Sequence, residues 1–206
     1  LDPAGTKNRE PANPDQFRTA NQAFASGLKS HPVTGQGLPQ YGTTILMNIL
    51  NEAGGLPTNN FSVGRFEEHD KISGETMAAT IVERGGQPTH GCHRGCGIRC
   101  SGIYVDKHGN YLSKAPEYET IWSHGAHCGI SDLDAIVLMD RLEDDYGFDT
   151  IDMGVAIGLA MQAGVIPYGD VQAAINLIHE AGRGTPLGRI IGAGAATVGR
   201  GLPDHG

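Results

Sequence analysis

Apolar residues recur at helical spacing in three stretches of the first half of the chain. Residues 14–29 place Phe17 and Phe24 on one face, and residues 43–52 and 73–84 carry similar apolar faces. A repeat of three or four residues is typical of an amphipathic α-helix. Each stretch therefore predicts a helix, and the segments between them predict loops, at 31–41 and 54–65.

A β-pattern lies near the middle of the chain. Residues 101–105 and 111–113 are rich in Ile, Tyr, Val and Leu, and they flank the turn-forming segment 106–110, which contains Gly109 and Asn110. Two such runs around a short polar loop predict a β-hairpin.

From Pro116 to about Arg200 the pattern is helical again. Five helix starts are indicated, each by an N-cap residue, an acidic first turn or a proline, near Glu117, Ser131, Asp149, Asp170 and Pro186. Helices joined by short connections form a packed α-helical unit. The fold class is therefore predicted to be predominantly α, a multihelical bundle-like domain with one small β-hairpin.

Composition removes several classes of function. The 206 residues include 15 Lys or Arg and 23 Asp or Glu, a formal net charge of -8, which argues against a general nucleic-acid binder or a binder of anionic membranes. The longest nearly apolar stretch, 153–161, is far shorter than the roughly 20 residues that span a bilayer. No membrane or nucleic-acid partner is therefore expected.

Three of the four cysteines lie within nine residues. Cys92, Cys96 and Cys100 are each separated by three residues, in a loop with several glycines and two arginines. This is a poor disulfide framework and a good cluster of soft metal ligands, so a reducing cytoplasm is expected. An iron-sulfur cluster, a zinc site of three cysteines with His90 or His93, and thiols without a metal all remain open. Cys128 stands apart and is interpreted as a buried structural thiol.

An acidic segment joins two of the predicted helices. Gly147 suits the left-handed residue that ends the first helix, and Asp149 suits the N-cap of the next. Three carboxylates at 143–145 face the negative end of the helix dipole, an arrangement that costs free energy when they are exposed. Since stability gives no reason for Asp144 there, a ligand-binding role is the alternative to a solvated charge run.

The order of several motifs resembles the aldehyde ferredoxin oxidoreductase family of tungsten-pterin enzymes. The resemblance extends from about residue 30 to residue 200 and rests on the cysteine loop and six further segments: 56–61 (LPTNNF), 72–75 (ISGE), 116–121 (PEYETI), 125–129 (GAHCG), 132–136 (DLDAI) and 144–151 (DDYGFDTI). It implies a linker and first helix at 1–30, leading from an N-terminal domain, and a helical middle domain at 31–206. It also implies that the N- and C-terminal domains of the same enzyme are its partners.

The resemblance also implies roles for individual residues. Metal ligands to a 4Fe-4S cluster would be Cys92, Cys96 and Cys100, although the family's usual spacing is two then three residues, so the loop must accommodate one extra residue before Cys96. A fourth ligand would lie outside this chain. The residues that would contact a pterin ring are those matching the family's acidic segment: Asp144, Gly147, Phe148 and Asp149.

A glutamate at the start of the helix after Pro116 is implied to line the substrate pocket. Glu119 matches better than Glu117 and would position or activate a water that attacks an aldehyde carbon. Pro116 and these carboxylates are also ordinary helix-start signals, so a purely structural role stays open.

The implied parent enzyme oxidises aldehydes to carboxylic acids at a tungsten- or molybdenum-bis-pterin centre. Electrons would pass through the 4Fe-4S cluster to ferredoxin, and the chain alone would be inactive. Two alternatives remain, a small zinc-binding protein-interaction module and a family member that reduces another acid or a thioester. The oligomeric state is open, a homodimer included.

Overall fold

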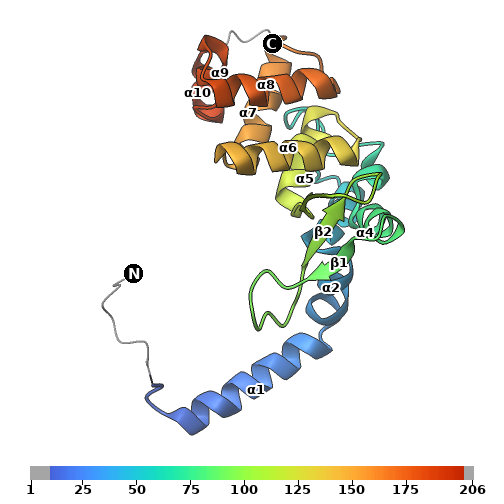
Figure 1. Ribbon diagram of the computed structural model, residues 1–206, viewed down its shortest axis with the longest axis vertical. Helices are drawn as coiled ribbons and strands as arrows, with labels where there is room; N and C mark the ends of the chain where they lie inside the picture. Colours follow the sequence, from blue (N-terminus) through green and yellow to red (C-terminus); the bar gives the residue numbers. More distant parts are fainter. Residues whose placement is uncertain (1–9, 202–206) are drawn as a thin grey trace.

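The computed structural model describes residues 10–201 and confirms a predominantly α-helical fold with one small sheet (Figure 1). Figure 1 shows an elongated molecule in which α1 projects as an arm at one end, the sheet lies in the middle, and α7 to α10 form the other end. The predicted linker before Glu10 and the last five residues lie outside the described part.

The arm is the predicted first helix. α1 spans Pro14–Ser30, begins at the N-cap Asn13, and has no buried residue. The side chains of Phe17 and Phe24 are 59% and 66% exposed. The helical pattern thus predicted the element correctly, whereas no neighbour within the described residues covers its apolar face.

The expectation of a loop at 31–41 is wrong. A short π-helix, Val33–Gly37, continues directly into α2, Leu38–Tyr41. Local bonds stabilise this continuation, since the Thr34 hydroxyl donates to the Leu28 carbonyl oxygen at 2.7 Å. The glycines of this segment hide its helical character from a pattern of apolar residues.

The next elements follow the predicted pattern. A 3₁₀ turn, Thr43–Ile45, leads into α3, Leu46–Ala53, which ends at Gly54 with a left-handed backbone. After the predicted loop, a second 3₁₀ turn, His69–Ile72, precedes α4, Gly74–Glu83, whose N-cap is Ser73.

The sheet has three antiparallel strands in the order β1-β2-β3, one more than the predicted hairpin. β2, Ser101–Val105, and β3, Tyr111–Lys114, are the expected pair, and β1, Gln87–His90, was not expected. Proline and glycine in and before β1 lower its strand propensity, so its pairing with β2 decides its conformation. The loop with three cysteines connects β1 to β2.

Helices follow to the end of the described chain. They are α5 (Tyr118–His124), a 3₁₀ turn (Ala126–Cys128), α6 (Leu133–Tyr146), α7 (Thr150–Gln162), α8 (Val171–Arg183), α9 (Pro186–Ile191) and α10 (Ala195–Gly201). The N-caps at Asp149 and Asp170 are as expected, whereas α6 is capped by Asp132 and not by Ser131. The last predicted helix is divided in two because the chain turns at Gly194, which has a φ of 88°.

The core extends from α3 and α4 through β2, α5, α6 and α7 to the last helices, and α5 packs closely on α7. Gly154 and Gly158 of α7 face Ser123 and His127, and a Cβ at Gly158 would approach the His127 ring to 2.2 Å. These two glycines therefore permit a close approach of α7 to α5 and the turn after it. None of the helices in residues 10–201 is long and apolar enough to cross a membrane. The division at residue 30 stays a prediction.

Candidate functional site

The last two turns of α6 carry four carboxylates that form ion pairs. Asp140 is buried, and the ammonium of Lys114 on β3 lies 3.0 Å from each of its carboxylate oxygens. The same ammonium lies 2.9 Å from Oδ2 of Asp144, and the Ser113 hydroxyl donates to Asp140 at 3.1 Å. Lys114 therefore links two carboxylates, one turn apart on α6, to β3 at the edge of the sheet.

Glu143 points into the core, where it meets a histidine. Nε2 of His124 lies 2.8 Å from Oε1 of Glu143, and both side chains are fully buried. Nδ1 of His124 is 3.1 Å from the Thr120 carbonyl oxygen, which can only accept, so this nitrogen donates. Burial lowers the pKa of His124, but the charge and hydrogen bond of Glu143 raise it further, and the net pKa is above its ordinary value.

Each of the three carboxylates at 143–145 has a stabilising partner, which the helix-dipole argument from the sequence did not take into account. Glu143 pairs with His124, Asp144 with Lys114, and Asp145 with Arg141 at 3.0 Å. Each cation offsets the unfavourable position at the carboxyl end of a helix. The dipole argument for a function of Asp144 therefore no longer stands by itself.

An open pocket lies over this network, between the start of α5, the end of α6 and the start of α7. It is lined by residues from four elements and their connections, Lys114, Glu117, Glu119, Thr120, Asp140, Asp144, Phe148, Asp149, Thr150 and Ile151. Four of the residues singled out from the sequence are thus in one place: Glu119, Asp144, Phe148 and Asp149. Five carboxylates and one ammonium make the pocket strongly anionic.

Two of the predicted residues have local structural roles that the structure confirms. Gly147 ends α6 with a left-handed backbone at φ 79°. Oδ1 of Asp149 accepts from the N–H groups of Ile151 and Asp152 at 3.1 and 2.8 Å, as an N-cap does.

The two glutamates before α5 differ in their contacts. The carboxylate of Glu117 already has a partner, because its Oε2 accepts a hydrogen bond from the Thr43 hydroxyl at 2.6 Å. Glu119 is exposed at the pocket rim and makes no side-chain hydrogen bond within residues 10–201. It is therefore the one of the two with a free carboxylate for a ligand.

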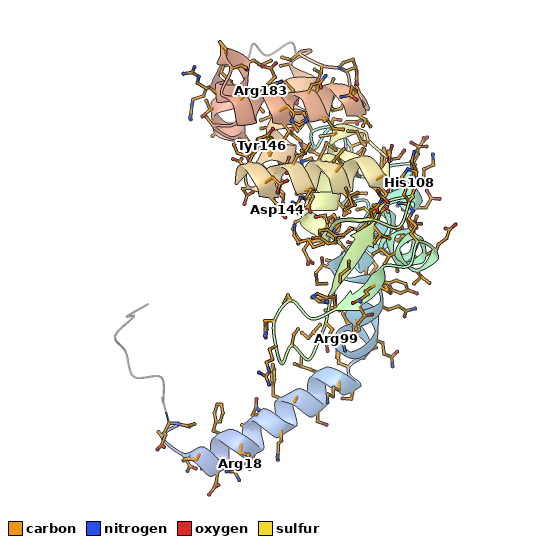
Figure 2. All side chains as sticks on the ribbon, in the orientation of Figure 1. Arg18, Arg99, His108, Asp144, Tyr146 and Arg183 are labelled. Carbon is orange, nitrogen blue, oxygen red and sulfur yellow. The ribbon has the colours of Figure 1, made fainter. Side chains whose placement is uncertain are left out.

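The cysteine loop extends from the sheet toward α1, so that Arg99 lies away from the helix that carries Asp144 (Figure 2). A ring nitrogen of His93 and the Sγ atoms of Cys92 and Cys96 all lie within 4.8 Å of one another. The N–H of Arg99 donates to Sγ of Cys96 at 3.3 Å. This contact and the N–H of Ile98 lower the pKa of the Cys96 thiol.

Cys100 differs from the other two cysteines of the loop. It is the residue before β2 and is not part of the group around His93. Burial, followed by the negative charge of Glu117, raises the pKa of its thiol. The donor set of three thiolates, N–H groups aimed at sulfur and nearby arginines fits an iron-sulfur cluster, provided that the loop opens to bring Cys100 level with Cys92 and Cys96.

Cys128 is fully buried, as expected of a structural thiol. Its Sγ lies 3.3 Å from the Ser123 carbonyl oxygen, and burial raises its pKa well above the ordinary value. The neighbouring His127 is also buried, and burial lowers its pKa to about 4. Neither side chain reaches the pocket or the cysteine loop.

Lys114, His124 and Asp140 were not singled out from the sequence. The sequence did contain a sign that Asp140 is buried. Asp140 and Glu143 follow Ile136 and Met139 at helical spacing, and therefore lie on the apolar face of α6. A carboxylate on such a face is seldom buried without a partner. Nothing in the pattern pointed to Lys114 as that partner.

Comparison with known proteins identifies the family of this chain. Residues 19–202 match a family model described as aldehyde ferredoxin oxidoreductase, domains 2 and 3. The chain therefore belongs to the aldehyde ferredoxin oxidoreductase family, and the resemblance read from its motifs is confirmed.

Individual relatives are similar over most of the chain. It is 41% identical over 158 residues to a tungsten-containing aldehyde ferredoxin oxidoreductase of Pyrococcus abyssi, and 36% identical over 158 residues to that of Pyrococcus furiosus. Each alignment covers 77% of this chain and 25% of the relative, so the chain spans about a quarter of their length. A subunit of Pyrococcus furiosus named aliphatic sulfonate oxidoreductase, WOR-like, is 30% identical over 115 residues, 48% of this chain and 18% of that subunit.

Proposed function

We propose that this chain forms one wall of the pterin site in an enzyme that oxidises aldehydes to carboxylic acids. The observation that carries the proposal is the pocket itself. Glu119 and the segment 144–149 are separated by a whole helix in the sequence, yet both line the same open pocket. The resemblance had assigned the first to substrate and the second to the pterin.

The chemistry of the pocket supports a ring edge rich in N–H donors as its ligand. The amino and ring N–H groups of a pterin resemble a guanidinium edge, for which carboxylates are strong bidentate acceptors. Lys114 occupies Oδ2 of Asp144, and the cap occupies Oδ1 of Asp149. Within the described residues the second oxygen of each carboxylate has no hydrogen bond, so it is available to the ligand.

The anionic pocket also limits what else it accepts. Phosphate groups would be repelled by five carboxylates around a single ammonium. The phosphate end of the cofactor is therefore expected to lie against another part of the enzyme.

Different residues of the chain would bind the ring, the water and the cluster. A tungsten or molybdenum bis-pterin would supply the oxidation chemistry at the substrate carbon. Asp144 and Asp149 would orient the ring, and Glu119 would hold and deprotonate a water. Cys92, Cys96 and Cys100 would hold three irons of a 4Fe-4S cluster that passes electrons to ferredoxin, in a reducing cytoplasm.

A second candidate reaction is the oxidation or reduction of another acid derivative. The similarity to the sulfonate oxidoreductase subunit points to it, but this similarity covers 48% of the chain, against 77% for the aldehyde enzymes. The aldehyde reaction is therefore the function that the observations favour.

The test uses two neighbouring aspartates in the complete enzyme. Asp144 and Asp145 are both about half exposed, and each has one cationic partner, but only Asp144 lines the pocket. We expect Asp144→Asn to lower bound pterin and tungsten by at least about tenfold, because an amide offers one acceptor and one donor in place of two acceptors. The matched control Asp145→Asn should keep both. Equal retention in the two variants would contradict the proposal.

Substitution of Asp149 tests the proposal in a second way, because it affects stability as well as pterin binding. Its carboxylate is also a helix cap, so Asp149→Ala should lower both pterin content and the free energy of unfolding, the latter by about 0.5–2 kcal/mol. Loss of stability with full pterin content would assign it to the cap alone.

A further inference from the structure

A buried ion pair next to the pocket has no part in the proposed function. His124 on α5 and Glu143 on α6 are both fully buried, and Nε2 of His124 lies 2.8 Å from Oε1 of Glu143. No other hydrogen bond joins α5 to α6 in the part of the chain that the structure describes. Within residues 10–201 the pair is therefore the single directional contact between these two helices.

Both ends of the pair are attached to residues of the pocket wall. Nδ1 of His124 donates to the Thr120 carbonyl oxygen at 3.1 Å, and Thr120 lines the pocket beside Glu119. At the other end, Glu143 directly precedes Asp144, which lines the same pocket. The pair thus connects the segment that carries Glu119 to the segment that carries Asp144.

Other hydrogen bonds of α5 hold it to α7. The Thr120 hydroxyl lies 2.8 Å from the Thr150 hydroxyl, and the Ser123 hydroxyl donates to the Thr150 carbonyl oxygen at 3.3 Å. These contacts orient α5 toward the start of α7, whereas the ion pair orients it toward the end of α6. The pair therefore acts on the one distance across the pocket that these contacts do not set.

Stability alone gives little reason for this pair. Oε2 of Glu143 is buried and has no hydrogen-bond partner within the described residues. A buried oxygen without a partner costs free energy, and apolar residues of similar volume often stabilise such a site as well as an ion pair does. An ion pair adds a defined direction and distance, because a charge-assisted hydrogen bond has a narrow geometry. The geometry that the pair imposes therefore explains it better than the stability that it adds.

We propose that His124 and Glu143 are a positioning pair that sets the distance between Glu119 and Asp144 across the pocket. The inference rests on the proposed function, in which Glu119 holds a water and Asp144 orients the ring. A fixed distance between the two keeps the water at the substrate carbon, and a misplacement of about 1 Å can cost about a hundredfold in rate. Neither member of the pair touches substrate or cofactor, since both side chains are fully buried.

The experiment compares two variants of the complete enzyme, at a temperature at which both are folded. In the double variant His124→Leu with Glu143→Leu, apolar packing replaces the pair and the hydrogen bond is lost. In Glu143→Gln the charge is lost but a hydrogen bond remains, because the amide donates to Nε2 of a neutral imidazole. We expect kcat to fall at least about tenfold in the double variant and less than about threefold in Glu143→Gln, with little change in KM for the aldehyde.

Two further measurements separate positioning from a general loss of structure. Pterin content should stay at the parent level in the double variant, because Asp144 and Asp149 keep their acceptors. Hydrogen exchange of the amides should become faster in α5 and stay slow in α8. The control for stability is Ile178→Val, on the buried face of α8 and not part of the pocket, which should lower the thermal midpoint without a change in kcat.

Two results would overturn the proposal. One is a double variant with the kcat and the hydrogen exchange of the parent, which would make the pair a packing element only. The other is an equal fall in kcat in Glu143→Gln and in the double variant, which would assign the effect to the charge. Failure of the proposed function is recognised separately, because Asp144→Asn would then retain its pterin, whereas the positioning pair is judged from kcat and hydrogen exchange.

Discussion

The acidic end of α6 and the cysteine loop flank the same small sheet, but they are built in opposite ways. At the end of α6, Lys114, His124 and three carboxylates hold one another at 2.8–3.0 Å, and two of the carboxylates are fully buried. In the loop, Cys92 and His93 are exposed, and the hydrogen bonds join residues of the loop to one another. The first region is held by contacts between several elements of the fold, whereas the side-chain contacts of the second join residues of the same loop.

This difference in organisation indicates how each region would bind a cofactor. A pocket whose carboxylates are already held by ion pairs binds a ligand without a large cost of ordering side chains. A loop that is free of the core can adapt to an ion or to a cluster. The four predictions below test this contrast, beginning with the largest expected effect.

Removal of one member of the buried pair should cost most. Glu143→Ala leaves His124 buried without its charge partner, and breaking such a pair costs about 3–5 kcal/mol. Urea denaturation of the 206-residue chain measures this change. The double variant Glu143→Leu with His124→Leu is the control and should recover much of the loss. A cost below 1 kcal/mol for Glu143→Ala would mean that this region is no more rigid than the loop.

Lys114→Met should have the next largest effect. It leaves the Asp140 carboxylate, which is 1% exposed, with the Ser113 hydroxyl as its remaining side-chain partner. Because Lys114 itself is 45% exposed, we expect a smaller loss than for the core pair, about 2–3 kcal/mol. Lys107→Met, in the exposed hairpin turn, is the matched control and should change stability by less than about 0.5 kcal/mol. Equal effects of the two variants would contradict an organised network.

The buried pair should also make stability depend on pH. The folded pKa of His124 is above the ordinary value of about 6.5, so the folded chain keeps a proton that the unfolded chain releases. This contribution is fully present below about pH 6.5 and is lost as the pH rises through the folded pKa. The slope should reach up to about 1.4 kcal/mol per pH unit.

Denaturation of the parent chain at a series of pH values measures the slope. The variant His124→Phe should lack it, whereas His93→Gln in the exposed loop should retain it. Stability that rises with pH across this range would show that Glu143 does not hold a charged histidine.

The smallest effect is expected in the loop. Cys92→Ser should change the free energy of unfolding by less than about 0.5 kcal/mol without a metal, since the side chain is exposed. Hydrogen exchange should show fast exchange of the loop amides and slow exchange of those in α6. Reconstitution of the complete enzyme with iron and sulfide should slow exchange in the loop, and Cys92→Ser should prevent this slowing. Slow exchange in the loop without metal would remove the contrast between the two regions.

Features that depend on neighbours within a few residues were predictable from the sequence. Asp149 caps α7 through N–H groups two and three residues away, and Gly147 ends α6 through its own backbone conformation. The hairpin at 101–114 and the helices after Pro116 follow from the same kind of local signal, and the motifs that they carry were enough to identify the family.

Other features were decided by the tertiary structure alone. β1 exists because β2 offers it hydrogen bonds, and the pairs of Lys114 with Asp144 and of His124 with Glu143 join residues 30 and 19 positions apart. The sequence shows that Asp144 stands at the unfavourable end of a helix, but only the packing of β3 against α6 supplies the ammonium that stabilises it. A local pattern records which residues share a helix face, whereas the free energy of a buried or paired charge depends on distances that the fold sets.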